Sequence, residues 1–326
     1  MSEGRALWEL ARPRLLPYVV LLPFVGWAWA HWDRALPARG VAALLGVLVA
    51  WALLHAGTLW LNASVDRDEG EVLLGRAVEP PPRTAAWGYV ALVAAVSIAA
   101  WSHPGAGLAC LGCAVLSVAY SHPRVLLKGH PLGGPAVNVV GYGILSPLAG
   151  WLVVGVDPNP RTVVVWGLAQ LGILGPYFAA QAFQQHEDAA RGYRTLVVTH
   201  GPRTTLQVAR ACLGVAFAAG LLLAAVGWIP RSCLIGVVGW WAVDRWMVRW
   251  AQQPGGGGGR WARGFTKRMA YAVILGISLA FAEYAHQSLH GRPVAGLGTA
   301  SGFPSDRPRL PPSVLRGLDL DRDRTR

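Results

Sequence analysis

The stretch VAALLGVLVAWALLHAGTLWLNASVDRDEGEVLLGR, residues 41–76, runs from a long apolar segment directly into a cluster of carboxylates. Its first part, residues 41–61, is long enough to cross a bilayer, which takes about 20 residues of helix. The acidic side chains that follow are Asp66, Asp68, Glu69 and Glu71. Carboxylates beside a membrane-type segment are costly, so they indicate function. This stretch therefore predicts a membrane helix with a site at its end.

Apolar runs of similar length recur along the chain of 326 residues, which is 53% hydrophobic and 14% charged. Soluble domains carry about 25% charged residues. We therefore expect an all-α, polytopic membrane bundle of nine transmembrane helices. Strands of a transmembrane barrel are short and alternate in polarity, which these runs do not. The nine expected spans are about 15–32, 41–61, 86–102, 105–120, 135–156, 162–184, 205–228, 232–250 and 266–286.

The chain divides into two parts by composition. Residues 1–290 contain all the apolar runs, and we expect them to form one transmembrane domain. Residues 291–326 are polar, rich in Pro, Gly and Arg, and without apolar periodicity. Such a segment buries too little apolar surface to fold, so we expect a disordered polar tail.

Basic side chains are unevenly distributed among the loops. The formal net charge is +12, and the loops after the second, fourth, sixth and eighth expected spans carry more Lys and Arg than those on the opposite side. The positive-inside rule places these loops and the N-terminus in the cytoplasm. This pattern serves topology and anionic lipid headgroups. We expect a multi-pass protein with the lipid bilayer as partner and no nucleic-acid binding.

Two of these loops begin with oxygen-bearing side chains at helical spacing. Asn62, Asp66 and Glu69 follow steps of three or four at the end of the second expected span, and Gln184 and Asp188 do so after the sixth. Residues with this spacing share one face of a helix. Hard oxygen ligands suit Mg²⁺. A solvated, charge-balanced loop is the alternative for either cluster alone, but matched clusters on one side favour a metal site.

A third loop, residues 120–138, adds cations. Tyr120, Arg124 and Lys128 lie four residues apart, although Pro123 argues against a plain helix. Arg and Lys suit phosphate charge, the one as a bidentate fork and the other as a point charge. Their alternative role is to set membrane topology. Together the three loops predict an apolar substrate with a diphosphate head.

These motifs resemble those of the UbiA superfamily of intramembrane prenyltransferases, over roughly residues 8–286. Asn62 and Asp66 resemble the start of its NxxxDxxxD-type motif, and residues 184–188 its DxxxD motif. Tyr120 and Arg124 resemble its Tyr and Lys four residues apart. The chain departs from the pattern where Gly70 and Gln184 replace acids.

The resemblance implies a Mg²⁺-dependent transfer of a polyprenyl group from a prenyl diphosphate to a lipid- or quinone-precursor acceptor. Asp66 and Asp188 would hold Mg²⁺ against the diphosphate, and Tyr120 would stabilise an allylic cation. The implied metal ligands are Asn62, Asp66, Asp68, Glu69, Gln184, Glu187 and Asp188. The implied diphosphate ligands are Asn62, Arg76, Arg124 and Lys128.

Two alternatives stay open at this point. A membrane terpene cyclase or diphosphate lyase would ionise the same donor without an acceptor. A transporter or non-catalytic lipid-binding protein could use the same scaffold, and the two missing acids motivate this alternative. Polar clusters at helix ends on one side, rather than broken helices at the bilayer midplane, favour an enzyme over a transporter.

Overall fold

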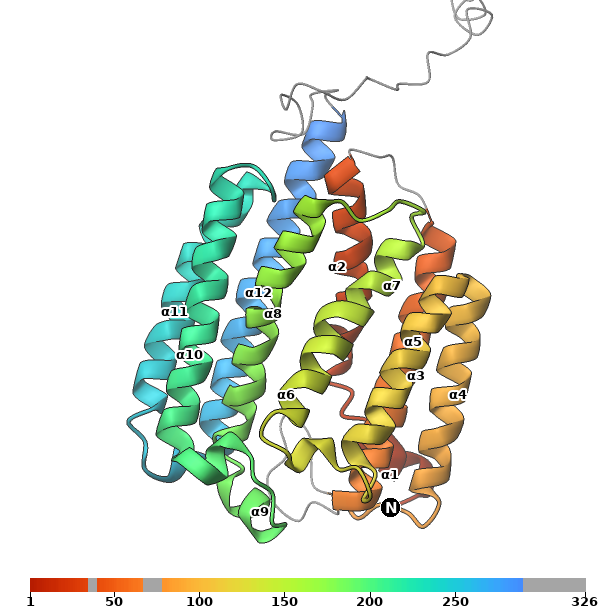
Figure 1. Ribbon diagram of the computed structural model, residues 1–326, viewed down its shortest axis with the longest axis vertical. Coiled ribbons are helices and arrows are strands. Elements are labelled where there is room, and N and C mark those ends of the chain that lie inside the picture. Colours follow the sequence, from red (N-terminus) through yellow and green to blue (C-terminus); the bar gives the residue numbers. More distant parts are fainter. Residues whose placement is uncertain (35–39, 67–77, 290–326) are drawn as a thin grey trace, which may run out of the picture.

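The structure is a computed structural model that describes residues 1–34, 40–66 and 78–289. Within these ranges the chain is all-helical and contains no strand, as predicted. The α-helices are α1 (Glu3–Leu10), α2 (Leu16–Arg34), α3 (Val41–Asp66), α4 (Thr84–Ser102), α5 (Pro104–Ser121), α6 (Gly133–Asn138), α7 (Ser146–Leu152), α8 (Pro160–Gln181), α9 (Gln185–Ala190), α10 (Leu196–Ala225), α11 (Gly236–Trp250) and α12 (Gly258–Leu289). Shorter elements are the 3-10 helices η1 (Leu127–Gly129), η3 (Arg231–Ile235) and η4 (Pro254–Gly256), and the π-helix η2 (Val139–Leu145). The long helices lie roughly along one direction (Figure 1).

Six helices in the described ranges are long and apolar enough to cross a membrane: α3, α4, α5, α8, α10 and α12. The nine expected spans are therefore not all confirmed. The expected span 135–156 is divided into α6, η2 and α7, because the π-helix interrupts the α-helical hydrogen bonding. The expected span 232–250 becomes η3 followed by α11, which has 15 residues. The remaining expected span, 15–32, lies in α2, which has 19 residues.

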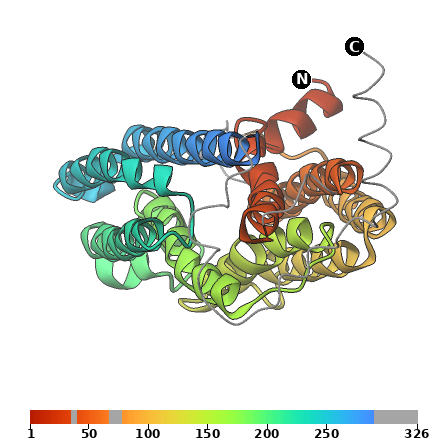
Figure 2. The same cartoon turned by 90° about the horizontal axis from the view of Figure 1, so that it is seen from above.

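The bundle has two packed halves. One hydrophobic cluster joins α3, α4, α5 and α7, around fully buried residues such as Val47 and Trp51. The other joins α8, α10, α11 and α12, around residues such as Leu213 and Trp250. Figure 2 shows the two halves side by side when the bundle is viewed from above. Each half supplies different elements to the end of the bundle where the polar loops gather.

Tryptophan side chains connect the halves near the opposite end of the bundle. Trp151 of α7 is fully buried, and its ring packs edge-on against Trp29 of α2 and Trp166 of α8, with centroids 5.8 and 5.5 Å apart. The indole N–H of Trp151 donates to the carbonyl of Val156 at 2.6 Å. Large aromatic side chains in edge-on contact stabilise an interface beyond their buried area.

Small residues let α2 and α7 approach closely. A Cβ at Gly150 of α7 would lie 1.7 Å from the carbonyl oxygen of Pro23, and one at Gly26 of α2 would lie 1.8 Å from that of Pro147. Neither position has room for any other residue. Such close backbone contact is typical of helices packed in a membrane.

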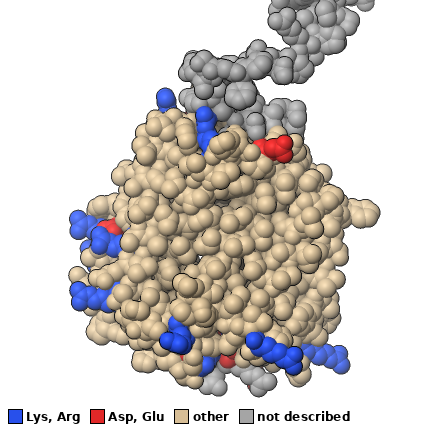
Figure 3. All heavy atoms as spheres, viewed as in Figure 1, with Lys and Arg blue, Asp and Glu red and all other residues tan. Residues whose placement is uncertain are grey.

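The outer surface of the bundle is largely uncharged. Exposed apolar side chains lie along the long helices, among them Leu45, Val93, Leu108, Tyr271 and Phe281. Figure 3 shows this lateral surface, with charged side chains at the two ends of the molecule and along one edge. An apolar belt of this size matches a lipid environment, because soluble monomers rarely expose contiguous apolar surface on that scale.

Candidate functional site

The last turn of α3 and the loop after α5 meet around one buried cation. Asn62 and Asp66 lie on the same face of α3, as predicted from their spacing. The Lys128 ammonium donates to Asn62 Oδ1 at 2.9 Å and to Asp66 Oδ1 at 2.5 Å. Both charged side chains are more than nine-tenths buried. Removing either partner would leave an uncompensated buried charge, so the pair acts as a unit.

Hydrogen bonds to backbone groups hold the loop that carries Lys128. The Nδ1 atom of His130 accepts from the N–H groups of Leu132 and Gly133, at 3.2 and 3.1 Å, where α6 begins. The backbone N–H of Arg194 donates to the Gly129 carbonyl at 2.9 Å. These bonds fix the Lys128 loop against the segment between α9 and α10.

The short helix α9 supplies the second acid. Asp188 is 7% exposed, and its Oδ2 accepts from Thr195 Oγ1 at 2.9 Å. Burial raises the pKa of Asp188 to about 6, and the carboxylates of Asp66 and Glu187 add to this, while Thr195 and Arg191 oppose it. Desolvation disfavours the charged form of a carboxyl group unless a cation or donors compensate for it. Asp188 is therefore suited to gain from a bound cation.

Tyr193 connects the two acidic motifs directly. Its hydroxyl donates to Asp66 Oδ1 at 3.2 Å, and its ring lies so close to Gly129 that a Cβ there would be 2.9 Å from Cδ1. Lys128 lies over the same ring, 6.0 Å from its centroid. Burial, and then the negative charge of Asp66, raise the pKa of Tyr193. The phenol is therefore a hydrogen-bond donor at neutral pH.

Further polar groups lie beside this centre. Tyr120 of α5 interacts electrostatically with both Asp66 and Asp188. Gln181, at the end of α8, donates from Nε2 to the Tyr177 hydroxyl at 2.9 Å. Its Oε1 atom is buried and has no hydrogen-bond partner among the described residues. A buried carbonyl oxygen without a donor is costly, which makes it available to a ligand.

The structure brings some of the predicted site residues together and leaves others apart. Asn62, Tyr120, Lys128, Asp66 and Asp188 belong to one neighbourhood. Glu187 instead pairs with Arg191 at 3.8 Å on the surface of α9. Arg124 is exposed in its loop. Gln184 is half-buried at the N-cap of α9, where its side chain makes no capping bond. Asp68, Glu69 and Arg76 lie outside the described residues, as does Gly70.

The donor set fits a magnesium ion bound partly by its substrate. The described residues contain no cluster of three or more His, Cys, Asp or Glu side chains that could hold a metal by itself. However, the Lys128 ammonium already bridges Asn62 and Asp66, so these oxygens converge on a cation. Asp188 adds a buried carboxylate, and the Oε1 atom of Gln181 adds an acceptor that has no hydrogen-bond donor among the described residues. Magnesium commonly uses one or two carboxylates together with phosphate oxygens and water.

Two residues of the site, Tyr193 and Ser121, were not predicted from the sequence. The hydroxyl of Ser121 donates to Asn62 Oδ1 at 3.2 Å. Tyr193 lies 127 positions from its partner Asp66. Spacing within one helix carries no information about such a contact. The sequence did contain one indication of a role for Tyr193. This residue lies between Gly192 and Thr195, in the segment that follows the second acidic motif.

An all-helical membrane bundle with two acidic motifs at one end defines a class of intramembrane enzyme. The profile of the UbiA prenyltransferase family matches residues 19–258, and the chain belongs to this family. It is a prenyltransferase.

Comparison with characterised proteins agrees with this assignment. The chain is 27% identical over 234 residues to a protoheme IX farnesyltransferase of Synechococcus elongatus, covering 67% of this chain and 69% of that protein. The fold resembles a UbiA homolog from Archaeoglobus fulgidus bound to DMAPP and Mg²⁺, with a TM-score of 0.61, 16% identity, and coverage of 86% and 99% of the two chains. It also resembles a digeranylgeranylglyceryl phosphate synthase, with a TM-score of 0.54, 15% identity, and coverage of 89% and 100%. At these identities the structural likeness shows a shared fold.

Proposed function

We propose that this chain is a Mg²⁺-dependent integral-membrane prenyltransferase that moves a polyprenyl group from a prenyl diphosphate to a lipid- or quinone-precursor acceptor. The observation that carries the proposal is the convergence of Asp66 and Asp188 with Lys128 at one end of the bundle. The solved relatives support the donor class, since homologs from Archaeoglobus fulgidus bind DMAPP or GPP together with Mg²⁺.

The proposed chemistry begins with departure of the diphosphate. The C–O bond of the donor breaks, and its electron pair leaves with the diphosphate. Mg²⁺, when bound, neutralises charge that develops on this leaving group. Asn62, Asp66 and Asp188 would hold the ion, with Gln181 or Gln184 adding an amide oxygen. Lys128 holds a fixed positive charge at the same place, which favours departure because a preorganised charge in a dry site costs no reorganisation.

The allylic cation then reacts with an electron-rich acceptor, which forms the new bond and loses a proton. Tyr120 interacts electrostatically with both acids and would offer an aromatic face to the cation. Such an interaction contributes about 2 kcal/mol when water is excluded. The burial of Asp66 and Asp188 supports such exclusion.

We extend the proposal to the membrane arrangement. The six long helices, together with α2, the broken segment α6–η2–α7, and α11, would make nine crossings. The ends of α3, α5 and α8 and the helix α9 lie at one end of the bundle (Figure 1). The loops that follow α5 and α9 at this end carry Arg124, Arg191 and Arg194. We place this end in the cytoplasm by the positive-inside rule. Residues 1–290 form the catalytic domain and residues 291–326 a separate polar tail in this proposal.

The test is turnover of a radiolabelled prenyl diphosphate by membranes containing wild-type protein, D66A or D188A. Each variant should lose more than about 100-fold in rate, because each removes a carboxylate used in the transition state. The matched control is E79Q, which removes an exposed acid that belongs to no part of the site. Unchanged turnover in both Asp variants would contradict the site assignment.

The same assay separates the alternatives. Cyclic or linear hydrocarbon products formed without an acceptor would instead indicate a terpene cyclase or diphosphate lyase. If Mg²⁺ does not increase the affinity for prenyl diphosphate, a non-catalytic lipid-binding or transport protein is the better interpretation.

A further inference from the structure

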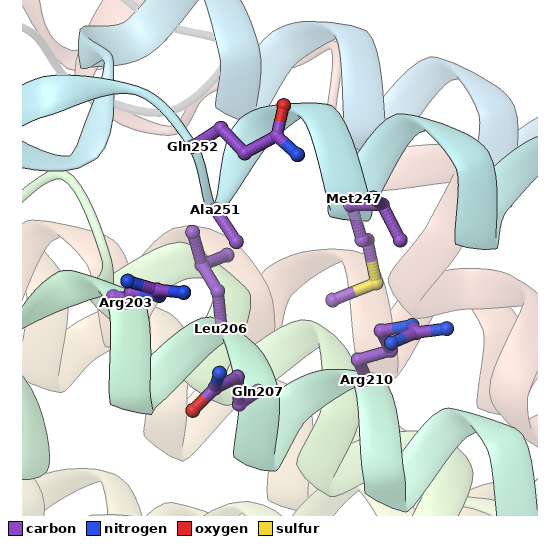
Figure 4. A pocket seen from close by; sticks show the side chains of 8 residues that line it. Arg203, Leu206, Gln207, Arg210, Met247, Ala251 and Gln252 are labelled. Atoms are coloured by element: carbon purple, nitrogen blue, oxygen red, sulfur yellow. The ribbon is translucent and has the colours of Figure 1, made fainter.

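We propose that a groove between α10 and α11 binds the phosphate headgroup of an anionic phospholipid, at a position separate from the candidate active site. The groove encloses about 160 Å³ (Figure 4). It is lined by Arg203, Leu206, Gln207 and Arg210 of α10 and by Met247, Val248, Ala251 and Gln252 at the end of α11.

The lining has an apolar floor and a polar rim. Leu206 and Met247 are buried and belong to the hydrophobic cluster that also contains Ala179 of α8. Arg203, Gln207 and Gln252 are exposed. Figure 4 shows Arg203 and Arg210 toward opposite ends of the groove, with Gln252 across from them on the α11 side. This combination suits an amphiphile better than a wholly polar or wholly apolar ligand.

The charges in the groove differ in their pairing. Arg210 donates to both carboxylate oxygens of Asp244, at 2.5 and 3.2 Å, although its side chain is 49% exposed. Arg203 is also exposed, and it makes no ion pair with any described residue. Asp244 is the single acidic residue of α10 and α11, which together carry four arginines. The surface of this helix pair is therefore strongly positive, and Figure 3 shows charged side chains along the edge that it forms.

The depth of each arginine in the membrane explains why Arg210 has an acidic partner and Arg203 has none among the described residues. Arg203 follows directly after the bend at Gly201 and Pro202, and Gln252 follows the end of α11. Arg210 lies two turns further along α10, roughly 10 Å deeper at the usual rise of a helix. An arginine at that depth is costly without a partner, and Asp244 supplies one. Arg203 lies at the level of the helix ends, where it has no acidic partner among the described residues and can meet a phosphate.

The occupant that satisfies these features is a phospholipid of the leaflet on the same side as the candidate active site. Its phosphate lies at the level of the helix ends, and its acyl chains continue along the apolar surface of α10 and α11. Basic grooves between membrane helices at this level bind anionic headgroups. A free phosphate ion would gain nothing from Leu206 and Met247. The charge excess favours an anionic lipid over a zwitterionic one.

The experiment measures lipid retention by the full chain. Delipidated protein in mild detergent is titrated with phosphatidylglycerol or with phosphatidylcholine of the same acyl chains, and bound lipid is counted by native mass spectrometry. The wild type should retain phosphatidylglycerol preferentially. R203Q should weaken this binding about fivefold, as expected for loss of one cation near the surface, whereas R203K should retain it. The matched control is R260Q, which replaces an exposed arginine near the start of α12 and should bind the lipids as the wild type does.

Several results would overturn the proposal. One is equal retention of the two lipids by the wild type, and another is an equal loss of binding in R203Q and R260Q. Displacement of phosphatidylglycerol by millimolar inorganic phosphate would indicate a site for the free ion instead. Disulfide cross-linking between two chains that carry Q207C would show that a second copy occupies the groove.

Discussion

At the scale of single residues, Lys128 is the side chain on which the site depends most. It is the cation that bridges Asn62 and Asp66, and both charges are almost fully buried. We predict that K128M lowers the unfolding free energy by about 3–5 kcal/mol, because Asp66 is left buried and unpaired. D66N/K128M should recover most of this stability, since no buried charge remains, yet it should be inactive. Thermal unfolding and turnover measured on the same samples check both statements. Equal destabilisation in the single and double variants would show that the pair does not act as a unit.

Asp188 gives a pH dependence with a definite sign. Burial raises its pKa to about 6, so below that pH the carboxyl group is protonated and cannot bind a cation. Magnesium affinity should fall as the pH drops from 7 to 5, approaching a tenfold loss per unit below pH 6, because binding must release a proton. T195V removes the hydrogen bond that lowers this pKa, so the midpoint should move upward. Calorimetric Mg²⁺ titrations across this range test the shift. E79Q should follow the wild-type curve, and an unshifted midpoint in T195V would contradict the role of the hydrogen bond.

Tyr193 tests the connection between the two motifs. Y193F keeps the ring against Gly129 but removes the bond to Asp66. A hydrogen bond to a charged group contributes about 1.5–3 kcal/mol, so the rate should fall roughly tenfold or more. Loss of the same bond should lower the unfolding free energy by at most this amount, because the ring contact with Gly129 is retained. Steady-state turnover and thermal unfolding separate these effects, and wild-type turnover in Y193F would show that the bond is not used in the reaction.

At the scale of helices, α2 and α7 approach each other closely at two glycines, Gly26 and Gly150. G150A places a Cβ 1.7 Å from the Pro23 carbonyl oxygen, which is backbone and has little room to move. We predict a loss of about 1–3 kcal/mol of unfolding free energy, the cost typical of overpacking. G167A is the matched control, because a Cβ at this position of α8 meets nothing within 4 Å. Its higher helix propensity should leave stability unchanged or slightly increased. Chemical unfolding in micelles compares the two, and equal stability of both variants would contradict the packing argument.

At the scale of the whole molecule, the sequence best predicted the features that depend on residues close together along the chain. The spacing of Asn62 and Asp66 predicted a shared helical face, and the long apolar runs predicted the helical bundle. The division of residues 135–156 was not predicted, because a π-helix keeps the same apolar composition as an α-helix. The partners of Lys128 and Tyr193 were not predicted either, since both contacts join segments more than 60 positions apart. Pairing across the bundle follows from helix packing, which periodicity does not encode.

The number of membrane crossings can be tested through the broken segment α6–η2–α7. If it crosses the membrane, the end of α5 and the start of α8 face opposite compartments, as their positions at opposite ends of the bundle indicate (Figure 1). Single cysteines replacing Arg124 and Arg161, in a background whose four native cysteines are changed to alanine, report this. We expect an impermeant maleimide added to right-side-out vesicles to label R161C, and to label R124C after the vesicles are opened. R83C should behave like R124C, because the start of α4 lies at the same end. Labelling of R124C and R161C from one side would show that the π-helical segment folds back within the bilayer and would reduce the count of crossings.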